Sequence, residues 1–506
     1  MSAPTTLSEL LQDVASEHGP HEALISRRGR VTYAALAAKA EVLAGGLAAR
    51  GVAPGTHVAL LAPNWPEWMA LAFAVWRTGA VLVPINTLYR ARELAHALCH
   101  ADVTHLVAAR RFLKHDYEAA LAESGVSLAD VVWLDPPASD AAVDLSSLSE
   151  AGMTPDRARS DAPATILFTS GSTAAPKGVV HTHAALARAA LEDAAVLGIG
   201  PDDRTWGYLP FFFAGGLVAV ALATLARGAA VVLQEVFEPG DTLGLLRDER
   251  VSVFFAWPHQ AEALSQHPDF DRGALALSKG VGANTRWAES IYGPEHNAVG
   301  SYGMTETPPL CTAWSWDAPQ ERRTGSHGPP VGSREVRIVD PATGDALPRG
   351  EVGEIVVRGP TVMQGYYKED PAACFDAEHF FHTGDIGRLD SDGALHFVGR
   401  VKDVIKTAGA NVAAAEVEAV LAEHPAVGAA YVVGVPDPAR GENVAAFVVP
   451  NRAVDGEALL AHCRERLASY KVPRHLWLRD ESNLPLMGSG KADKVALRDE
   501  AARLVG

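Results

Sequence analysis

Short apolar runs alternate with segments of helical apolar spacing along the first 160 residues, and this alternation constrains the possible folds most. The helical spacing covers residues 7–17, 33–49 and 65–78. Apolar runs of strand length lie between and after them, at 57–61 and 80–84. Strands that alternate with helices predict an α/β fold with mostly parallel sheets.

The pattern changes near Gly332. Runs at 335–339, 353–358 and 394–398 have the composition of strands, and turn signals such as Asp392-Gly393 join them. Short strands without intervening helices predict a β-rich subdomain at the end of the large domain.

A new mixed unit begins after Arg400. It contains a predicted helix at 416–424, strands at 429–435 and 444–449, and a second helix at 456–468. We therefore predict a large N-terminal domain over 1–399, a hinge at 400–403, and a small, mobile α+β C-terminal domain over 404–506.

The composition is that of an ordinary soluble globular protein. The chain has 506 residues, of which 48% are hydrophobic and 21% charged, with a net charge of −17. Nucleic acids select basic surfaces, so this charge argues against a nucleic-acid partner. It does not exclude an anionic ligand, because a few local cations and backbone N–H groups suffice to bind phosphate.

No segment has the features of a secretory signal or a membrane span. Residues 207–226 carry no charge, but Pro210, Gly215 and Gly216 interrupt them, and we interpret them as a buried strand, turn and helix. Cys99, Cys311, Cys374 and Cys463 form no CxxC pair, which argues against a metal site or a disulfide framework. We expect free thiols and a cytoplasmic location.

A segment rich in hydroxyl groups and glycine follows the apolar run at 165–168. It reads Thr169, Ser170, Gly171, Ser172, Thr173, Ala174, Ala175, Pro176, Lys177, Gly178. Many donors and one mobile positive charge are what a polyphosphate needs. The segment is not a Walker A loop, since Pro176 stands where that motif has glycine. Taken alone, it predicts a phosphate-binding loop, with a flexible surface loop as the alternative.

A second segment, 301–307, carries groups suited to a nucleotide. The ring of Tyr302 can stack on a purine, Thr305 can hydrogen-bond a phosphate, and Glu306 is a hard oxygen ligand for Mg²⁺. Taken alone, the segment also fits an ordinary turn.

Two later segments add an acceptor and a cation. Asp385 follows the tight turn His382-Thr383-Gly384, where its carboxylate can accept from two ribose hydroxyls, and Arg400 lies downstream. Lys491 lies on a flexible Gly/Ser loop. Each also fits a turn or a solvated loop.

In combination these motifs resemble the adenylate-forming superfamily: acyl-CoA synthetases, the adenylation domains of peptide synthetases, and luciferases. The resemblance runs in order over nearly the whole chain. It includes Asn64-Trp65-Pro66-Glu67, Gly79-Ala80-Val81, Gly353-Glu354-Ile355, Arg358-Gly359, Thr383-Gly384-Asp385, Gly399-Arg400, Lys402-Asp403, Glu416-Val417-Glu418, Tyr470-Lys471-Val472-Pro473 and Gly490-Lys491.

The resemblance implies roles for the nucleotide-binding residues. The β- and γ-phosphates would be gripped by Thr169, Ser170, Gly171, Ser172, Thr173 and Lys177. Tyr302 and Gly303 would lie at the adenine, Thr305 at the α-phosphate, and Glu306 would help to hold Mg²⁺. Asp385 would accept from the ribose hydroxyls, with Arg400 beside it.

The resemblance also implies a catalytic lysine and a domain movement. Lys491 would bridge the carboxylate of the acid and the α-phosphate, where a fixed cation orients two anions and stabilises the developing charge. The C-terminal domain would rotate about a hinge at Lys402. This rotation would withdraw the face that carries Lys491 and present a second face, on which Gly409 shapes the thiol tunnel.

The chain departs from the family pattern at several positions. Ala174 replaces a usual glycine of the phosphate loop, which restricts the backbone. Ala413 and Ala414 stand where an aromatic residue and a proline are usual, so the thiol step is less firmly implied than the adenylation step. Phe213 stands where acyl-CoA synthetases commonly have a histidine. Unlike that histidine, its side chain cannot form a hydrogen bond.

Only the residues expected to line the substrate pocket give information about which acid is bound. By alignment the pocket would be lined by Phe213, Trp257, Gly280, Val281 and Gly282. The absence of an acidic residue over 211–216 argues against an α-amino acid. The two rings predict an aryl or short- to medium-chain acid, unless both are simply part of the core.

His181 and His183 form a further pair close to the phosphate loop. We place them at the start of a helix and interpret them as structural or capping residues, not metal ligands.

Three functions remain in competition at this stage. The leading hypothesis is an acid:CoA ligase that uses ATP, Mg²⁺ and CoA. The second is an adenylating enzyme that passes its acyl group to a carrier protein, an amine or another nucleophile. The third is a silent binding protein, against which the retained Lys177, Glu306, Asp385 and Lys491 argue. Monomer and homodimer both remain open.

Overall fold

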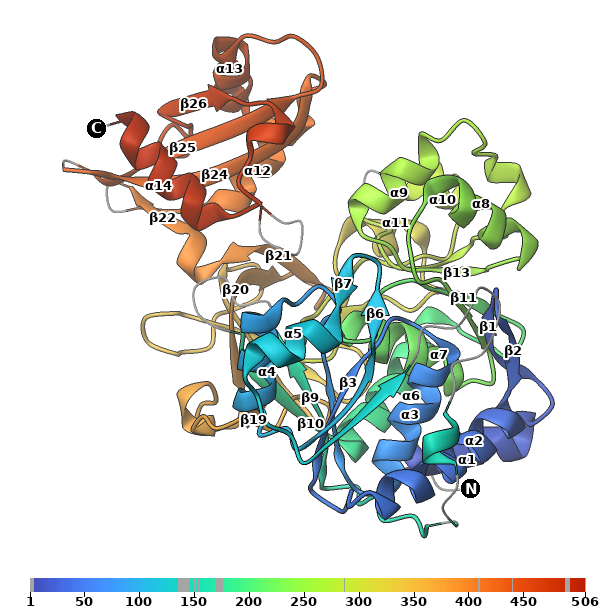
Figure 1. The fold of residues 1–506 in the computed structure, drawn as a ribbon. Helices are drawn as coiled ribbons and strands as arrows, with labels where there is room; N and C mark the ends of the chain where they lie inside the picture. The colour runs from blue at the N-terminus through green and yellow to red at the C-terminus, as the bar shows by residue number, and fades with distance from the viewer. Residues whose placement is uncertain are drawn as a thin grey trace.

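The computed structural model describes residues 4–134, 145–149, 152, 154–169, 176–285, 287–407, 410–438, 440–486 and 492–505. Figure 1 shows a large body, coloured blue to yellow, and a smaller body at the C-terminal end, coloured orange to red. Several predicted site residues lie outside the described residues: Ser170, Gly171, Ser172, Thr173, Ala174, Gly409 and Lys491.

The first sheet of the large body has six strands. They are β1 (Glu22–Ser26), β2 (Gly29–Thr32), β11 (Arg204–Gly207), β12 (Ala230–Leu233), β13 (Val253–Phe254) and β14 (Lys279–Gly280). Their spatial order is β14-β13-β11-β12-β1-β2, and only the β1–β2 pair among these is antiparallel.

The second sheet has seven strands. They are β3 (His57–Leu61), β4 (Val81–Pro84), β5 (His105–Ala109), β8 (Asp130–Leu134), β9 (Pro163–Phe168), β10 (Gly178–Thr182) and β19 (Gly365–Tyr366). The order is β19-β10-β9-β4-β3-β5-β8, parallel from β9 to β8 and antiparallel at β10. The prediction of mostly parallel sheets is confirmed.

Helices pack around and between these sheets. The helices of the large body are α1 (Leu7–His18), α2 (Tyr33–Ala49), α3 (Pro66–Arg77), α4 (Ala91–His100), α5 (Tyr117–Ser124), α6 (His183–Leu197), α7 (Ala223–Leu225), α8 (Pro239–Asp248), α9 (Pro258–Ser265), α10 (Ala288–Tyr292) and α11 (Gln320–Gly325). Helix α3 contacts β1 of the first sheet and both β3 and β4 of the second. It is buried on nearly every side, as a helix between two sheets must be.

The uncharged stretch 207–226 is mostly buried, as predicted. It leaves β11, turns, and forms a π-helix, Gly215–Leu222, that continues into α7 and packs against α6 and β11. A side chain at Gly216 would meet the Pro210 carbonyl oxygen, because a Cβ there would lie 2.2 Å from it. Among the described residues, none of the helices has the length and apolar composition that crossing a bilayer requires.

The predicted β-rich subdomain is also confirmed. It is an antiparallel sheet of β17 (Glu335–Val339), β18 (Gly353–Arg358), β20 (Phe381–Leu389) and β21 (Leu395–Arg400). A short hairpin pairs β15 (Ser301–Tyr302) with β16 (Thr312–Ala313). A second hairpin pairs β6 (Arg111–Phe112) with β7 (His115–Asp116).

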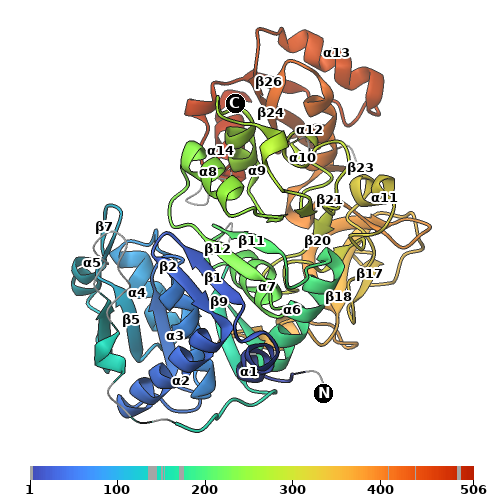
Figure 2. The same cartoon turned by 90° about the vertical axis from the view of Figure 1, so that its right-hand side faces the viewer.

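The small body is a mixed α+β unit, as predicted. Its strands and helices are β22 (Val404–Thr407), β23 (Ala410–Ala413), β24 (Val427–Asp437), β25 (Gly441–Pro450), β26 (His475–Leu478), α12 (Ala414–Glu423), α13 (Gly456–Arg466) and α14 (Lys494–Val505). A 3₁₀ turn, Val401–Asp403, joins it to β21, and α12 packs against β21 (Figure 2). The domain boundaries and the hinge at 400–403 stay predictions.

Candidate active site

The segment that follows β15 is folded back on itself. Gly303 permits this close approach, since a Cβ there would lie 2.2 Å from the Pro309 carbonyl oxygen. The Met304 N–H donates to the Thr307 hydroxyl, and the Thr307 N–H donates to the Met304 carbonyl. Glu306 is 5% exposed, whereas Thr305 is only half-buried. The turn therefore fixes the positions of three predicted site residues.

Asp385 and Tyr302 are joined directly. The Tyr302 hydroxyl donates to Asp385 Oδ2 at 2.8 Å, and Arg400 Nε lies 3.0 Å from Asp385 Oδ1. Burial raises the pKa of the Tyr302 phenol well above its ordinary value, and the nearby Asp385 charge adds to the rise. The phenol therefore stays a donor. The Tyr302 ring also stacks on the ring of Phe397.

The turn before Asp385 is held by a buried carboxylate. Glu354 Oε1 accepts from the Gly384 N–H at 3.0 Å, and Glu354 Oε2 lies 2.9 Å from His382 Nδ1. Gly384 has a φ of +69°, a left-handed conformation that favours glycine. Glu354 belongs to a motif quoted above, but sequence reasoning gave it no role; the structure makes it the anchor of the Asp385 turn.

Glu306 lies in the same electrostatic neighbourhood. Burial raises the pKa of its carboxyl, the Asp385 charge acts in the same direction, and a hydrogen bond from Tyr366 and the Arg400 charge oppose the rise. Mg²⁺ commonly takes one or two protein carboxylates beside phosphate oxygens and water. Glu306, a buried carboxylate in this neighbourhood, is a ligand of that kind.

The two ends of the predicted phosphate loop are closed by a backbone hydrogen bond. The Thr169 N–H donates to the Lys177 carbonyl at 3.0 Å, where β9 and β10 form an antiparallel pair. Lys177 Nζ lies 2.8 Å from Glu369 Oε2 and 4.6 Å from the centre of the Tyr366 ring. The ammonium group of Lys177, which is predicted to bind a polyphosphate, therefore pairs with the carboxylate of Glu369 in this structure.

One histidine of the pair is placed as predicted and the other is not: His183 is the first residue of α6. His181 lies in β10 and not in a helix, and the side chain of Thr182, not a histidine, caps α6 by accepting from the Ala185 N–H. Both histidines are buried, because the apolar residues of the sheet and α6 surround them. His181 Nε2 lies 2.7 Å from the Thr305 carbonyl oxygen, so it must carry the proton and donate. Burial lowers the pKa of His181 to about 4.

The residues expected around the acid meet at the ends of the first sheet. Phe213 and Trp257 make an edge-to-face contact with ring centres 6.2 Å apart. Both are partly exposed, so neither belongs to the buried core. Asn64 fixes the segment before Phe213, since its side chain bonds the carbonyls of Gly207 and Leu209 and the N–H of Phe211.

The glycine turn lies beside the nucleotide segment. Gly280 and Gly282 have φ values of +133° and +89°, and a Cβ at Gly280 would lie 2.0 Å from the Phe254 carbonyl oxygen. Val281 forms a bridge with Val299, two residues before β15. The acid segment and the Tyr302–Glu306 segment are therefore neighbours.

The C-terminal motifs hold the small body together around the Lys491 segment. Glu418 accepts from the Val432 N–H at 2.7 Å and pairs with Lys494 at 2.7 Å, which ties α14 to α12. Leu486 and Ala492 form an antiparallel bridge that flanks the segment with Lys491. Lys402 lies in the connecting 3₁₀ turn.

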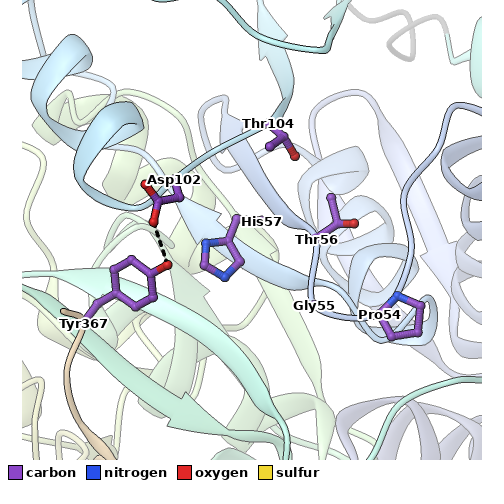
Figure 3. A pocket seen from close by; sticks show the side chains of 7 residues that line it. All are labelled: Pro54, Gly55, Thr56, His57, Asp102, Thr104 and Tyr367. Atoms are coloured by element: carbon purple, nitrogen blue, oxygen red, sulfur yellow. Dashed lines mark hydrogen bonds between the residues drawn. The ribbon is translucent and has the colours of Figure 1, made fainter.

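A pocket elsewhere on the surface does not contain the predicted site. It is lined by Pro54, Gly55, Thr56, His57, Asp102, Thr104 and Tyr367 (Figure 3). In it the Tyr367 hydroxyl donates to Asp102 at 2.9 Å. None of the predicted site residues is among these seven.

Family models match both parts of the chain. The model for the AMP-binding enzyme matches residues 11–367, and the model for the AMP-binding enzyme C-terminal domain matches residues 416–491. The chain belongs to the AMP-binding enzyme family. Its membership confirms the resemblance to the adenylate-forming superfamily, whose enzymes use ATP.

Relatives of this AMP-binding enzyme include CoA ligases. A feruloyl-CoA synthase of Amycolatopsis sp. is 36% identical over 490 residues, which cover 95% of this chain and 96% of that protein. A 2-succinylbenzoate–CoA ligase of Bacillus licheniformis is 33% identical over 93% of this chain and 95% of that protein.

Solved structures agree with this fold. The ATP-bound MatB from Rhodopseudomonas palustris has a TM-score of 0.86 and 30% identity, over 99% of this chain and 100% of that one. The amide bond synthetase McbA from Marinactinospora thermotolerans has a TM-score of 0.84 and 32% identity, over 98% of this chain and 100% of that one.

Proposed function

We propose that this enzyme joins a carboxylic acid to AMP and then passes the acyl group to the thiol of coenzyme A. The observation that carries the proposal is the grouping of Tyr302, Glu306, Asp385 and Arg400, with Lys177 joined to Glu306 through Tyr366. These groups supply the acceptor, carboxylate and cations that a nucleotide triphosphate requires.

In the first step a carboxylate oxygen of the acid attacks the α-phosphorus of ATP. The bond from that phosphorus to the bridging oxygen breaks, and pyrophosphate leaves with the electron pair. Asp385 accepts from the ribose, Lys177 exchanges Glu369 for phosphate, and Lys491 lies between the two reacting anions. A Mg²⁺ ion held by Glu306 would neutralise phosphate charge.

In the second step the sulfur of the thiol attacks the acyl carbon, the thiol proton is lost, and AMP leaves. We infer that the small domain turns about Lys402 between the steps and presents the segment around Gly409. Ala413 ends β23, next to α12, which begins at Ala414.

We propose an aryl acid as the substrate. Two partly exposed aromatic rings, Phe213 and Trp257, make an edge-to-face contact, and such rings favour an aromatic guest. The similarity to a feruloyl-CoA synthase supports the same class.

A panel of aryl and aliphatic acids, with ATP and Mg²⁺, tests the proposal. We expect aryl acids to yield AMP and, when CoA is added, an acyl-CoA of the matching mass. Turnover that CoA does not accelerate would contradict the thiol step. An amine added in place of CoA tests the second candidate, which the likeness to an amide bond synthetase and the Ala413-Ala414 pair favour.

A further inference from the structure

Tyr366 lies between two charged residues of the candidate site. Its hydroxyl donates to Glu306 Oε1 at 2.8 Å, and Lys177 Nζ lies 4.6 Å from the centre of its ring. A single side chain therefore contacts both the carboxylate expected to hold the metal ion and the lysine expected to hold the phosphates.

The backbone around Tyr366 is fixed to both partners. Strand β19 pairs with β10, so that Tyr366 lies opposite Val179, two residues after Lys177. The Met363 N–H donates to the Glu306 carbonyl oxygen at 2.9 Å. The strand pairing thus sets the position of Tyr366 relative to Lys177, and the Met363 hydrogen bond ties the segment before Tyr366 to Glu306.

In each contact, Tyr366 has a defined chemical role. A phenol near neutral pH is protonated, so the Tyr366 hydroxyl can hold Glu306 Oε1 only as a donor. This bond holds the orientation of the Glu306 carboxylate through Oε1. The ring face attracts the ammonium group of Lys177 whether or not Glu369 is its partner.

We propose that Tyr366 is a positioning residue for adenylation: its hydroxyl orients Glu306 toward the metal ion, and its ring holds Lys177 at the phosphates. The inference rests on the proposed function, because it assigns Glu306 and Lys177 the roles given there. Hydrogen-bond partners of metal ligands typically change metal affinity or activity by about 10- to 100-fold when removed.

The first test separates the hydroxyl from the ring. Tyr366→Phe keeps the ring and removes the donor, and ATP binding is measured by calorimetry without acid, once with Mg²⁺ and once with EDTA. We expect the gain in ATP affinity that Mg²⁺ brings to fall about tenfold or more, with unchanged binding in EDTA. Equal loss in both conditions, or no loss, would overturn the role of the hydroxyl.

Tyr367→Phe is the matched control. It removes a hydroxyl from the adjacent residue, which also donates to a carboxylate, but in the surface pocket at Asp102 (Figure 3). We expect wild-type binding of ATP in both conditions. A Tyr367→Phe protein with the same defect as Tyr366→Phe would show that the effect is not specific to Glu306.

The second test concerns the ring. Tyr366→Leu removes both contacts, and we expect ATP binding in EDTA to weaken about 2- to 5-fold beyond that of Tyr366→Phe. Identical binding by the two variants would overturn the role of the ring. If the wild-type protein binds no ATP, the proposed function itself is contradicted. If both variants bind ATP as tightly as the wild-type protein does, only this inference is contradicted.

Discussion

The nucleotide side and the acid side of the candidate site are built from different interactions. On the nucleotide side, Tyr302, Asp385 and Arg400 are joined by hydrogen bonds and ion pairs of 2.8 to 3.0 Å. On the acid side, Phe213 and Trp257 meet through an edge-to-face ring contact. Directional polar contacts demand particular residue types, whereas apolar contacts demand mainly shape and volume.

This difference explains how one scaffold can serve many acids. We propose that the polar side binds the nucleotide, which the reactions of this family share. The apolar side can change with one or two substitutions without disturbing the hydrogen bonds of the other. The two sides should therefore respond separately to mutation, except at a group that contacts both substrates.

We propose that Lys491 is that group, and its replacement should have the largest effect. We expect Lys491→Ala to lower the rate of pyrophosphate release about 10²- to 10³-fold, since a cation that stabilises the transition state is lost. The rate is measured with saturating ATP and acid. Lys114→Ala, in the exposed turn between β6 and β7, is the control. Near-wild-type release by Lys491→Ala, at an unchanged melting temperature, would refute the assignment.

Asp385→Asn should weaken recognition of the nucleotide and leave recognition of the acid unchanged. Hydrogen bonds to a charged group contribute about 1.5–3 kcal/mol, so wild type should prefer ATP over 2′,3′-dideoxy-ATP by about 10- to 100-fold. The variant should lose most of this preference, as measured by kcat/KM for both nucleotides, while KM for the acid stays unchanged. Asp392→Asn, on an exposed turn, serves as the control. Full discrimination by Asp385→Asn would contradict the ribose contact.

Phe213→Ala and Phe397→Ala form a crossed pair that sharpens the comparison. Phe213 contacts Trp257 on the acid side, and Phe397 stacks on Tyr302 on the nucleotide side. An aromatic contact is worth about 0.5–1.5 kcal/mol, so each variant should lose about 2- to 10-fold in kcat/KM for its own substrate and little for the other. The two constants are measured for each variant. Loss for both substrates in either variant would mean that the sides are coupled.

Glu369→Gln should have the smallest effect, and in the opposite direction. It releases Lys177 from a partly exposed ion pair, and such pairs contribute about 0.2–1 kcal/mol. We therefore expect KM for ATP to fall by up to about fivefold, and the gain to shrink at high salt. Weaker ATP binding by this variant would show that Glu369 helps to place Lys177 and does not compete for it.

Much of the fold was predictable from local patterns. The predicted helix over 33–49 and the predicted strand over 57–61 have the same bounds as α2 and β3. Apolar periodicity and turn residues determine these elements within a few residues of sequence. The same is true of the Tyr302–Glu306 and Thr383–Asp385 segments, whose polar residues stand close together in the chain.

Contacts between distant segments were not predictable in this way. Tyr366 and Glu306 are 60 residues apart, and their segments are joined by the hydrogen bond from the Met363 N–H to the Glu306 carbonyl oxygen. His181 was predicted at the start of a helix, because no local signal reveals that it donates to the Thr305 carbonyl from a strand.

Acid-dependent exchange of labelled pyrophosphate into ATP tests the central claim most directly, because it requires only the first step and no CoA. The account predicts that label enters ATP when an aryl acid and Mg²⁺ are both present, and that it does not when either is omitted. Exchange that is independent of acid, or the formation of ADP and phosphate in place of AMP and pyrophosphate, would contradict it.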